Sequence, residues 1–335
     1  MSNDLLAPPN APELPGLIFR RFRGEADFPG MVAVRDACMT VDGLEWPESV
    51  ADLARAFVHL TNCDPQRDMI VAEIKGEVTG FGQTTWYQQA DGTRLYHHWG
   101  FVTPGWRRHG VGSAILGWLE DRQRAIAATH PQDGPRFHQA EVFDSEKART
   151  ALLERYDYPV ARRWYQMTRP LDGDIPDAPL PDGLEVRPVT PDHYREIWDA
   201  DVEAFRDHWG YAEPKEEDYR SWLEDPVVMQ PELWQVAWDG DRIAGQVRTF
   251  INYKENAQQG RLRGYTEEIS VQRPYRRRGL ATALIMRSLH ILKEQGMTEA
   301  ALGVEAENIS GALRLYERCG FRVARSGAVY RKPMA

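Results

Sequence analysis

At residues 271–281 the chain reads Val271-Gln-Arg-Pro-Tyr-Arg-Arg-Arg-Gly-Leu-Ala281. This stretch follows the strand-like Glu268-Ile-Ser-Val-Gln, and apolar spacing predicts a helix from near Thr282. The first turn of a helix carries unpaired backbone N–H groups and a partial positive charge. Gly279 would let a ligand approach the backbone, and three consecutive arginines add positive potential. The stretch therefore predicts a seat for a phosphate or pyrophosphate.

Two well-known glycine motifs fit this turn less well. A Walker loop would need Gly-Lys-Ser/Thr, and a dinucleotide fingerprint would need three glycines at fixed spacing. The plain alternative is a tight strand-to-helix turn whose arginines lie in solvent. That alternative is weakened by a second copy of the turn, Val102-Thr-Pro-Gly-Trp-Arg-Arg-His-Gly-Val-Gly112, which lies 169 positions earlier.

Further segments repeat in the same order at a similar period. Leu17-Ile-Phe-Arg-Arg resembles Leu184-Glu-Val-Arg-Pro, and two hairpin-like segments begin at Met69 and Trp234. The helical segment from Ala151 resembles the one from Leu313. We therefore predict a flexible N-terminus over residues 1–16, one domain over 17–169, a Pro- and Asp-rich linker over 170–183, and a second domain over 184–335.

The chain's bulk composition agrees with this division. At 335 residues it is too long for one ordinary core, so two domains are expected. The net charge of −9 argues against nucleic acid as a partner. The three cysteines are far apart and His97 and His98 are adjacent on a strand, so no metal site is predicted. No apolar run is long enough to span a membrane, and no signal peptide is recognised, which favours the cytoplasm.

The turn and a later helix together point to a known family. Arg276-Arg-Arg-Gly-Leu-Ala281 resembles the acetyl-CoA loop of the GNAT N-acetyltransferase superfamily, and Asn308-Ile-Ser-Gly-Ala-Leu-Arg-Leu-Tyr-Glu-Arg-Cys-Gly-Phe321 resembles its Asn…Ala…Leu-Tyr-Glu…Gly-Phe block. Among tandem members the chain looks most like the mycothiol synthase-type group. The resemblance implies an α/β (α+β) fold of two tandem domains, each with a mixed, mostly antiparallel sheet flanked by helices.

The resemblance also implies which residues bind acetyl-CoA. Backbone N–H groups of the turn would hold the pyrophosphate, and the preceding strand would pair with the pantetheine arm. In the second copy the expected residues are Ile269, Ser270, Val271, Arg276, Arg277, Arg278, Gly279, Leu280, Ala281, Thr282 and Asn308. In the first copy they are Val102, Arg107, Arg108, His109, Gly110, Val111, Gly112 and Ser113.

Tyr316 is the expected general acid. A phenol with a pKa near 10 stays protonated at pH 7 and can give a proton to the departing thiolate. A tyrosine at this helix position is commonly the acid in the family. The first copy has Leu153 where Tyr316 stands, and Asp157-Tyr158 in place of Gly320-Phe321. Leucine cannot transfer a proton, so we predict a catalytically degenerate first domain and a catalytic second domain.

The general base is left open between neighbouring carboxylates. Glu267 and Glu268 lie on the strand before the turn, and strict alternation would turn only one of them toward the cleft. The mycothiol synthase-type group implies a position nearer Tyr265. Glu305 and Glu307, before Asn308, are further candidates. The oxyanion donor would be a backbone N–H around Val271.

These features predict transfer of an acetyl group from acetyl-CoA to a primary amine of a small molecule, by direct attack on the thioester. Two alternatives remain: a non-catalytic acyl-CoA-binding or regulatory module, and an acetyltransferase acting on protein N-termini or lysines. Asp207-His208-Trp209 could line the acceptor pocket or simply pack a helix end. The expected state is a monomer or a homodimer, and the acceptor's identity does not follow from the fold.

Overall fold

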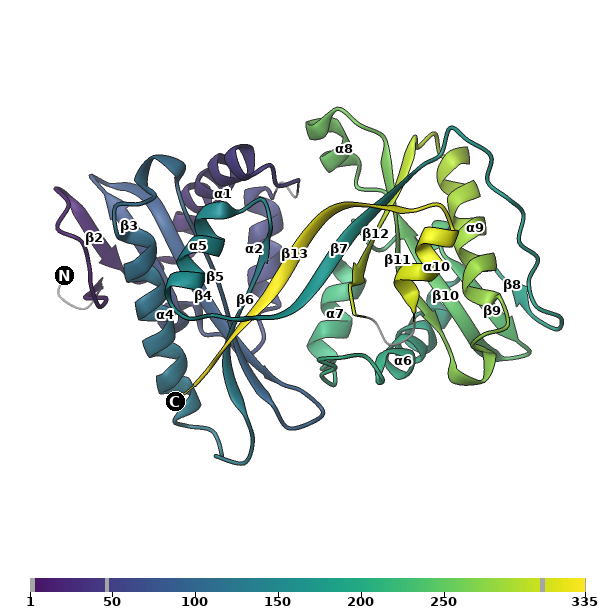
Figure 1. The fold of residues 1–335 in the computed structure, drawn as a ribbon, viewed down its shortest axis with the longest axis horizontal. Coiled ribbons are helices and arrows are strands. Elements are labelled where there is room, and N and C mark those ends of the chain that lie inside the picture. The colour runs from purple at the N-terminus through teal and green to yellow at the C-terminus, as the bar shows by residue number, and fades with distance from the viewer. Residues whose placement is uncertain (1–3, 46–47, 308–310, 335) are drawn as a thin grey trace. The chain divides into compact units, whose positions relative to one another are not determined.

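The chain of this computed structural model divides into two compact units, and the structure describes residues 4–45, 48–307 and 311–334 (Figure 1). The first unit comprises residues 1–162 together with residues 327–335. The second unit comprises residues 163–326.

The first unit is built on one sheet with strand order β1-β2-β3-β4-β5-β6-β13. Neighbouring strands are antiparallel except for the parallel pair β5 and β6, which gives a mixed, mostly antiparallel sheet. The strands are β1 (Leu5–Leu6), β2 (Leu17–Arg20), β3 (Met69–Ile74), β4 (Glu77–Gln88), β5 (Arg94–Val102), β6 (Arg136–Phe143) and β13 (Arg322–Pro333).

Helices cover both faces of this sheet. Alternate residues of β3 pack on opposite sides: Met69 and Val71 meet helices α1 and α2, while Ile70 and Ala72 meet helix α4. Because both faces are covered, β3 is apolar at nearly every position. The helices are α1 (Phe28–Asp42), α2 (Val50–Val58), α3 (Pro65–Asp68), α4 (Val111–Ala127) and α5 (Lys147–Arg155), with short 3₁₀ turns at Gly24–Asp27 and Pro104–Trp106.

The second unit repeats the design with strand order β7-β12-β11-β10-β9-β8. Helix α9 packs on one face through Leu284 and Leu289, and helix α6 packs on the other through Ile197. The strands are β7 (Val160–Pro170), β8 (Glu185–Val186), β9 (Gln235–Asp239), β10 (Arg242–Phe250), β11 (Arg263–Val271) and β12 (Glu299–Glu305). The helices are α6 (Tyr194–Phe205), α7 (Glu216–Glu224), α8 (Tyr253–Gln259), α9 (Leu280–Glu294) and α10 (Ala312–Arg318), with 3₁₀ turns at Pro191–His193, Pro231–Leu233 and Arg273–Tyr275.

The repeated hairpins expected from the sequence are confirmed. β3 and β4 pair antiparallel across Lys75 and Gly76, which have φ angles of 53° and 88°. β9 and β10 pair antiparallel across a turn that contains Gly240, with φ 58°. Positive φ angles at such positions match the right-handed twist of the paired strands. The sequence signals for these turns were therefore local and sufficient.

Each unit is completed by a strand from the other half of the chain. The boundary between the units therefore differs from the predicted one, which lay in the linker over residues 170–183. Most of β7 belongs to the second unit, where Trp164 to Pro170 pair with β12. Most of β13 belongs to the first unit, where Gly327 to Pro333 pair with β6. A strand pattern reveals that a segment is extended, but not which distant strand completes its hydrogen bonds. The exchange is therefore invisible in the repeat.

Two segments expected to be loose are packed instead. Leu171 and Ile175, in the Pro- and Asp-rich stretch, are buried in the core of the second unit. Near the N-terminus β1 pairs with β2, and Pro12 lies so close to Gly110 that an added Cβ there would be 3.0 Å away. Prolines and aspartates do prevent helix or sheet here, but isolated apolar residues still anchor the chain.

Candidate active site

The glycine turn of the second unit exposes the start of a helix. Arg277 and Gly279 have φ angles of 60° and 87°, and Gly279 caps α9 without any side-chain cap. The N–H of Ala283 bonds back to the Gly279 carbonyl at 3.0 Å, so the N–H groups before it have no intrahelical acceptor. A Cβ built on Gly279 meets no atom within 4 Å. These N–H groups lie at the positive end of the helix dipole and form a candidate anion seat.

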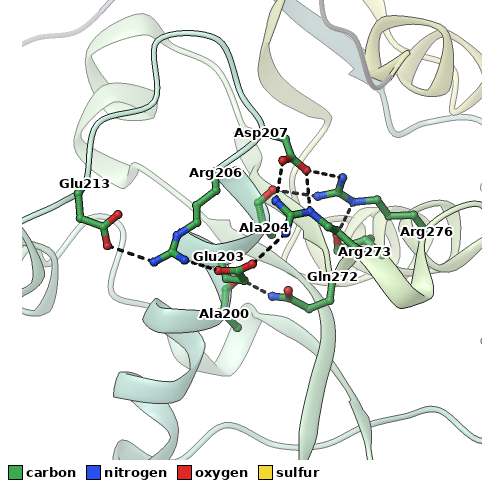
Figure 2. Close-up of polar contacts among 10 residues, drawn as sticks. Ala200, Glu203, Ala204, Arg206, Asp207, Glu213, Gln272, Arg273 and Arg276 are labelled. Atoms are coloured by element: carbon green, nitrogen blue, oxygen red, sulfur yellow. Dashed lines mark hydrogen bonds and ion pairs between the residues drawn. The ribbon is translucent and has the colours of Figure 1, made fainter. Parts of the chain in front are cut away.

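Arg276 holds the turn and does not point its charge outward. Its Nε donates to the Val271 carbonyl at 3.0 Å, and one Nη donates to the Ala204 carbonyl at 3.0 Å. Its other Nη contacts Asp207 at 3.1 Å, as Figure 2 shows. The same carboxylate accepts two bonds from Arg273, at 2.6 and 2.9 Å. Arg273 first and Arg276 second lower the pKa of Asp207 to about 2. Arg277 and Arg278 are exposed and remain near the anion seat.

Beside this turn, β11 has an open edge. β11 pairs with β12 only from Arg263 to Tyr265, and no further ladder pair joins them among residues 4–45, 48–307 and 311–334. On its other side β11 stays paired with β10 as far as Val271. Main-chain groups of Ile269 to Val271 can therefore face a ligand that enters between β11 and β12. An extended ligand arm could hydrogen-bond there as an added strand would.

A β-bulge interrupts β11 next to this edge. Gln246 pairs with Ser270, but the next pair is Arg248 with Glu267, so β11 carries one extra residue. Glu268, in the bulge, has φ 47°, a left-handed conformation. A bulge re-aims side chains and frees backbone groups from the ladder. The extra residue also breaks the strict alternation of side chains on which the one-carboxylate expectation depended.

The charge of Glu267 acts on the buried phenol of Tyr316. Tyr316 is the buried residue of α10, with 7% of its surface exposed. Burial first, and then the charge of Glu267, raise the pKa of this phenol, so it is protonated at neutral pH. Glu267 accepts a bond from the Gly303 N–H at 2.9 Å. Burial first, and then Glu268, raise the pKa of Glu267 to about 8. The second unit therefore holds both a phenol that stays protonated and a carboxyl group with a pKa near neutrality.

A buried ionic cluster that sequence reasoning missed lies behind the bulge. Arg248 donates to Asp201 at 2.7 Å and lies 3.5 Å from Glu268. Gln246 also donates to Asp201, at 3.1 Å. Burial, only partly opposed by Arg248, raises the pKa of Asp201 to about 7. The available signal was a single charged residue, an arginine, within the stretch Ile243-Ala-Gly-Gln-Val-Arg-Thr-Phe250.

The first unit repeats the turn closely. Arg108 and Gly110 have φ angles of 66° and 87°. Arg107 donates to the Val102 carbonyl at 3.1 Å and to both oxygens of Asp42, at 2.8 and 2.7 Å. A cavity of about 300 Å³ opens beside this turn. Its walls include six of the residues expected to bind coenzyme: Val102, Arg107, Arg108, Gly110, Gly112 and Ser113.

The first unit lacks the features placed around the bulge. Its strands β4 and β5 pair without a register shift from Gly80 to Gln88. Gln83 pairs with Trp99, where the second unit pairs Arg248 with Glu267. Leu153 is the buried residue of α5. His98 lines the cavity, but its Nε2 is engaged by the Tyr158 hydroxyl at 3.1 Å.

Other residues expected from the sequence lie away from the bulge or cannot be placed. Asp207 accepts hydrogen bonds from the arginines of the turn, and Asn308 lies outside the described residues. Glu305 ends β12 opposite Trp164. In the part of the chain that the structure describes, no three His, Cys, Asp or Glu side chains are grouped to hold a metal ion. No helix within those same residues is long and apolar enough to cross a membrane.

Comparison with known proteins agrees with this geometry. A family model described as the acetyltransferase (GNAT) family matches residues 33–156 and 194–321. The mycothiol acetyltransferase of Geodermatophilus obscurus is 28% identical over 258 residues, which cover 76% of this chain and 79% of that protein. The N-alpha-acetyltransferase 30 of Schizosaccharomyces pombe is 38% identical over 96 residues, covering 28% of this chain and 61% of that protein.

A solved structure is similar over nearly the whole chain. A GCN5-related N-acetyltransferase from Sphaerobacter thermophilus matches with a TM-score of 0.70 and 25% sequence identity, covering 95% of both chains. This chain therefore belongs to the GNAT acetyltransferase family, with one family region in each half. It is an acetyl-CoA-dependent N-acyltransferase, and the expected fold class is confirmed.

Proposed function

We propose that the second unit transfers the acetyl group of acetyl-CoA to a primary amine of a small molecule. One observation carries the proposal: Glu267 at the bulge of β11, the buried phenol of Tyr316 and the open glycine turn all belong to the same unit, and the charge of Glu267 acts on that phenol. A proton donor, a proton acceptor and an anion seat are the parts that acetyl transfer from a thioester requires.

The turn and the open strand edge fit acetyl-CoA. The N–H groups that follow Gly279 would hold its pyrophosphate, with Arg277 and Arg278 adding positive charge. Main-chain groups of Ile269 to Val271 would bond the pantetheine arm along the open edge. The acetyl thioester would then lie against the bulge, where a freed backbone N–H can stabilise negative charge on its oxygen.

Proton transfers complete the reaction. The attacking amine must be neutral, and an alkylamine has a pKa near 10.4, so a base is needed at pH 7. Glu267 would take this proton directly or through water, since its pKa of about 8 is well matched to the task. The amine nitrogen bonds to the acetyl carbon, and the carbon–sulfur bond then breaks. Tyr316 would give its proton to the departing thiolate, and the proton that the nitrogen loses as the amide forms would return to the Tyr316 phenolate through water.

The first unit would bind coenzyme without turnover. Its turn has nearly the same φ angles as the second, and its cavity reaches Leu116 and Leu153. It has neither the bulge nor a phenol at the position of Tyr316. We therefore assign it a structural or coenzyme-holding role within the enzyme.

A second candidate acceptor is the α-amine of a protein. The similarity to a yeast N-alpha-acetyltransferase over 96 residues favours it. The likeness to a mycothiol acetyltransferase over 76% of the chain favours a small acceptor.

One experiment separates the two acceptors. Thiol release from acetyl-CoA would be followed with a panel of small amines, including glucosamine and cysteine amide, and with a set of short peptides with free N-termini. Small amines should be acetylated with the higher kcat/KM. A higher kcat/KM for the peptides would establish the second candidate instead. No thiol release with either set would overturn the proposed function.

A further inference from the structure

The ionic cluster behind the bulge has one exposed end. Arg248 is 5% exposed and Asp201 is 7% exposed, whereas half of the Glu268 side chain is exposed. The buried members are held tightly, because Asp201 accepts from both Arg248 and Gln246. The indole of Trp222 covers the guanidinium, with the Arg248 Cζ 5.1 Å from the ring centre. The buried Arg248–Asp201 pair therefore supports the half-exposed carboxylate of Glu268 from the protein interior.

Arg248 has more donors than the described residues satisfy. Its Nε and one Nη have no partner among residues 4–45, 48–307 and 311–334, although both atoms are shielded from solvent. A buried guanidinium that forgoes hydrogen bonds costs stability. Such a departure from full hydrogen bonding is expected at functional or strained sites.

The charges of the cluster leave it negative. One guanidinium faces the carboxylates of Asp201 and Glu268. Because burial raises the pKa of Asp201 to about 7, that carboxyl is partly protonated at neutral pH, and Glu268 is the carboxylate that a solute can reach. An acceptor amine arrives mostly protonated at pH 7. The cluster therefore complements an alkylammonium group.

The first unit offers an internal comparison. At the strand positions of Arg248 and Glu267 it has Gln83 and Trp99, and its β4–β5 ladder has no bulge. The charged strand residues, the bulge and the phenol of Tyr316 thus occur together in the second unit, and the first unit has none of the three at the equivalent positions. Because these features occur together only in the unit that carries Tyr316, they are associated with catalysis and not with the coenzyme turn that both units share.

We infer that Glu268, positioned by Arg248 and Asp201, is the binding site for the acceptor's ammonium group. The inference rests on the proposed function and assigns two different roles to the neighbouring carboxylates Glu267 and Glu268. Glu268 binds the ammonium and orients it, whereas Glu267 removes the proton before attack. Arg248 is a positioning residue, since it acts only through Glu268. Acceptors with a free primary ammonium are therefore selected over their hydroxyl analogues.

Substitutions at Glu268 separate the carboxylate from the bulge. Glu268→Gln and Glu268→Gly remove the charge, and glycine tolerates the positive φ. Both should raise KM for the best amine of the panel about ten- to hundredfold, because charge-assisted hydrogen bonds are the stronger ones. The values of kcat and of KM for acetyl-CoA should stay within about threefold. Glu268→Val strains the bulge and should lower kcat as well.

Two further variants test the positioning role. Arg248→Lys keeps the charge and should raise the amine KM less than Arg248→Gln does. Melting temperatures would show whether either variant has lost its fold. Glu294→Gln, at an exposed position of α9, is the matched control and should change neither constant.

The outcomes distinguish the inference from the proposed function. An unchanged amine KM in both Glu268→Gln and Glu268→Gly would overturn the inference, even with Glu267 and Tyr316 still essential. A fall in kcat with an unchanged amine KM would instead make Glu268 the base, which also overturns it. Failure of the proposed function would show as undiminished turnover in Tyr316→Phe and Glu267→Gln.

Discussion

Leu153 and Tyr316 occupy the same place in their respective units. Each is the buried residue of its helix, α5 or α10. The Leu153 carbonyl accepts from the Tyr158 N–H at 3.1 Å, and the Tyr316 carbonyl accepts from the Phe321 N–H at 3.0 Å. The residue before each donor, Asp157 or Gly320, has a positive φ. The two units therefore share this helix end but differ in whether it carries a phenol.

Replacing that phenol is the most direct test of the acid. Tyr316→Phe keeps the ring that packs in the core but removes the proton donor. We expect kcat to fall about 100- to 1,000-fold, a typical contribution of general acid catalysis. Steady-state thiol release measures the effect. Tyr253→Phe, at a position 60% exposed, is the control and should have no effect. A Tyr316→Phe enzyme within threefold of the wild type would remove the acid role.

Glu267 gives the reaction a predicted pH dependence. Its pKa is raised to about 8, so the base form grows as pH rises through that value. The kcat/KM profile for the amine should therefore rise with an inflection near pH 8, and rise further as the free amine loses its proton. In Glu267→Gln the inflection near 8 should vanish and the rate should fall about 100-fold or more. An unchanged profile would assign the base elsewhere.

The same shift has a consequence for stability. An unfolded glutamate titrates near 4.3, so the folded protein binds more protons than the unfolded chain between about pH 4.3 and pH 8. Burial of Glu267 therefore makes the free energy of unfolding decrease as pH rises through this window. In Glu267→Gln this contribution is absent, and urea midpoints at pH 5 and pH 8 should differ less than in the wild type. An equal difference between the two urea midpoints in the wild type and in Glu267→Gln would contradict the raised pKa of Glu267.

Both glycine turns can be tested by counting bound coenzymes. Calorimetric titration should find two coenzymes per wild-type chain. Gly279→Val and Gly110→Val each place a β-branched residue at φ 87°, which distorts the turn. Each variant should bind one coenzyme, and only Gly279→Val should lose turnover. A wild-type stoichiometry of one would show that the cavity of the first unit serves another purpose.

Sequence reasoning succeeded where the signal was local. The glycine turns, the two hairpins and the Tyr316 helix each depend on contiguous residues with characteristic φ or spacing. It did not show the strand exchange, because partners such as Trp164 and Glu305 lie far apart in the chain. The bulge at Glu268 escaped for a similar reason. It arises from the register in which β10 and β11 pair, and no residue type in the strand predicts it.

Asp207 offers a last test, because it links the early helix of the second unit to the coenzyme turn. Its carboxylate binds Arg273 and Arg276, and Arg276 in turn holds the carbonyls of Val271 and Ala204. Asp207→Asn keeps the shape but removes the charge. Because Arg276 retains its two carbonyl contacts, we expect KM for acetyl-CoA to rise only about three- to tenfold, with kcat nearly unchanged.

Salt provides the check on this mechanism. Asp207 is 47% exposed, so its pairs with the arginines are screened as ionic strength rises. The ratio of the variant KM to the wild-type KM should therefore shrink between 50 mM and 500 mM salt. Asp241→Asn, in an exposed turn of the same unit, should leave KM unaltered at both concentrations. A ratio that does not depend on salt would mean that Asp207 holds the turn through its hydrogen-bond geometry and not through its charge.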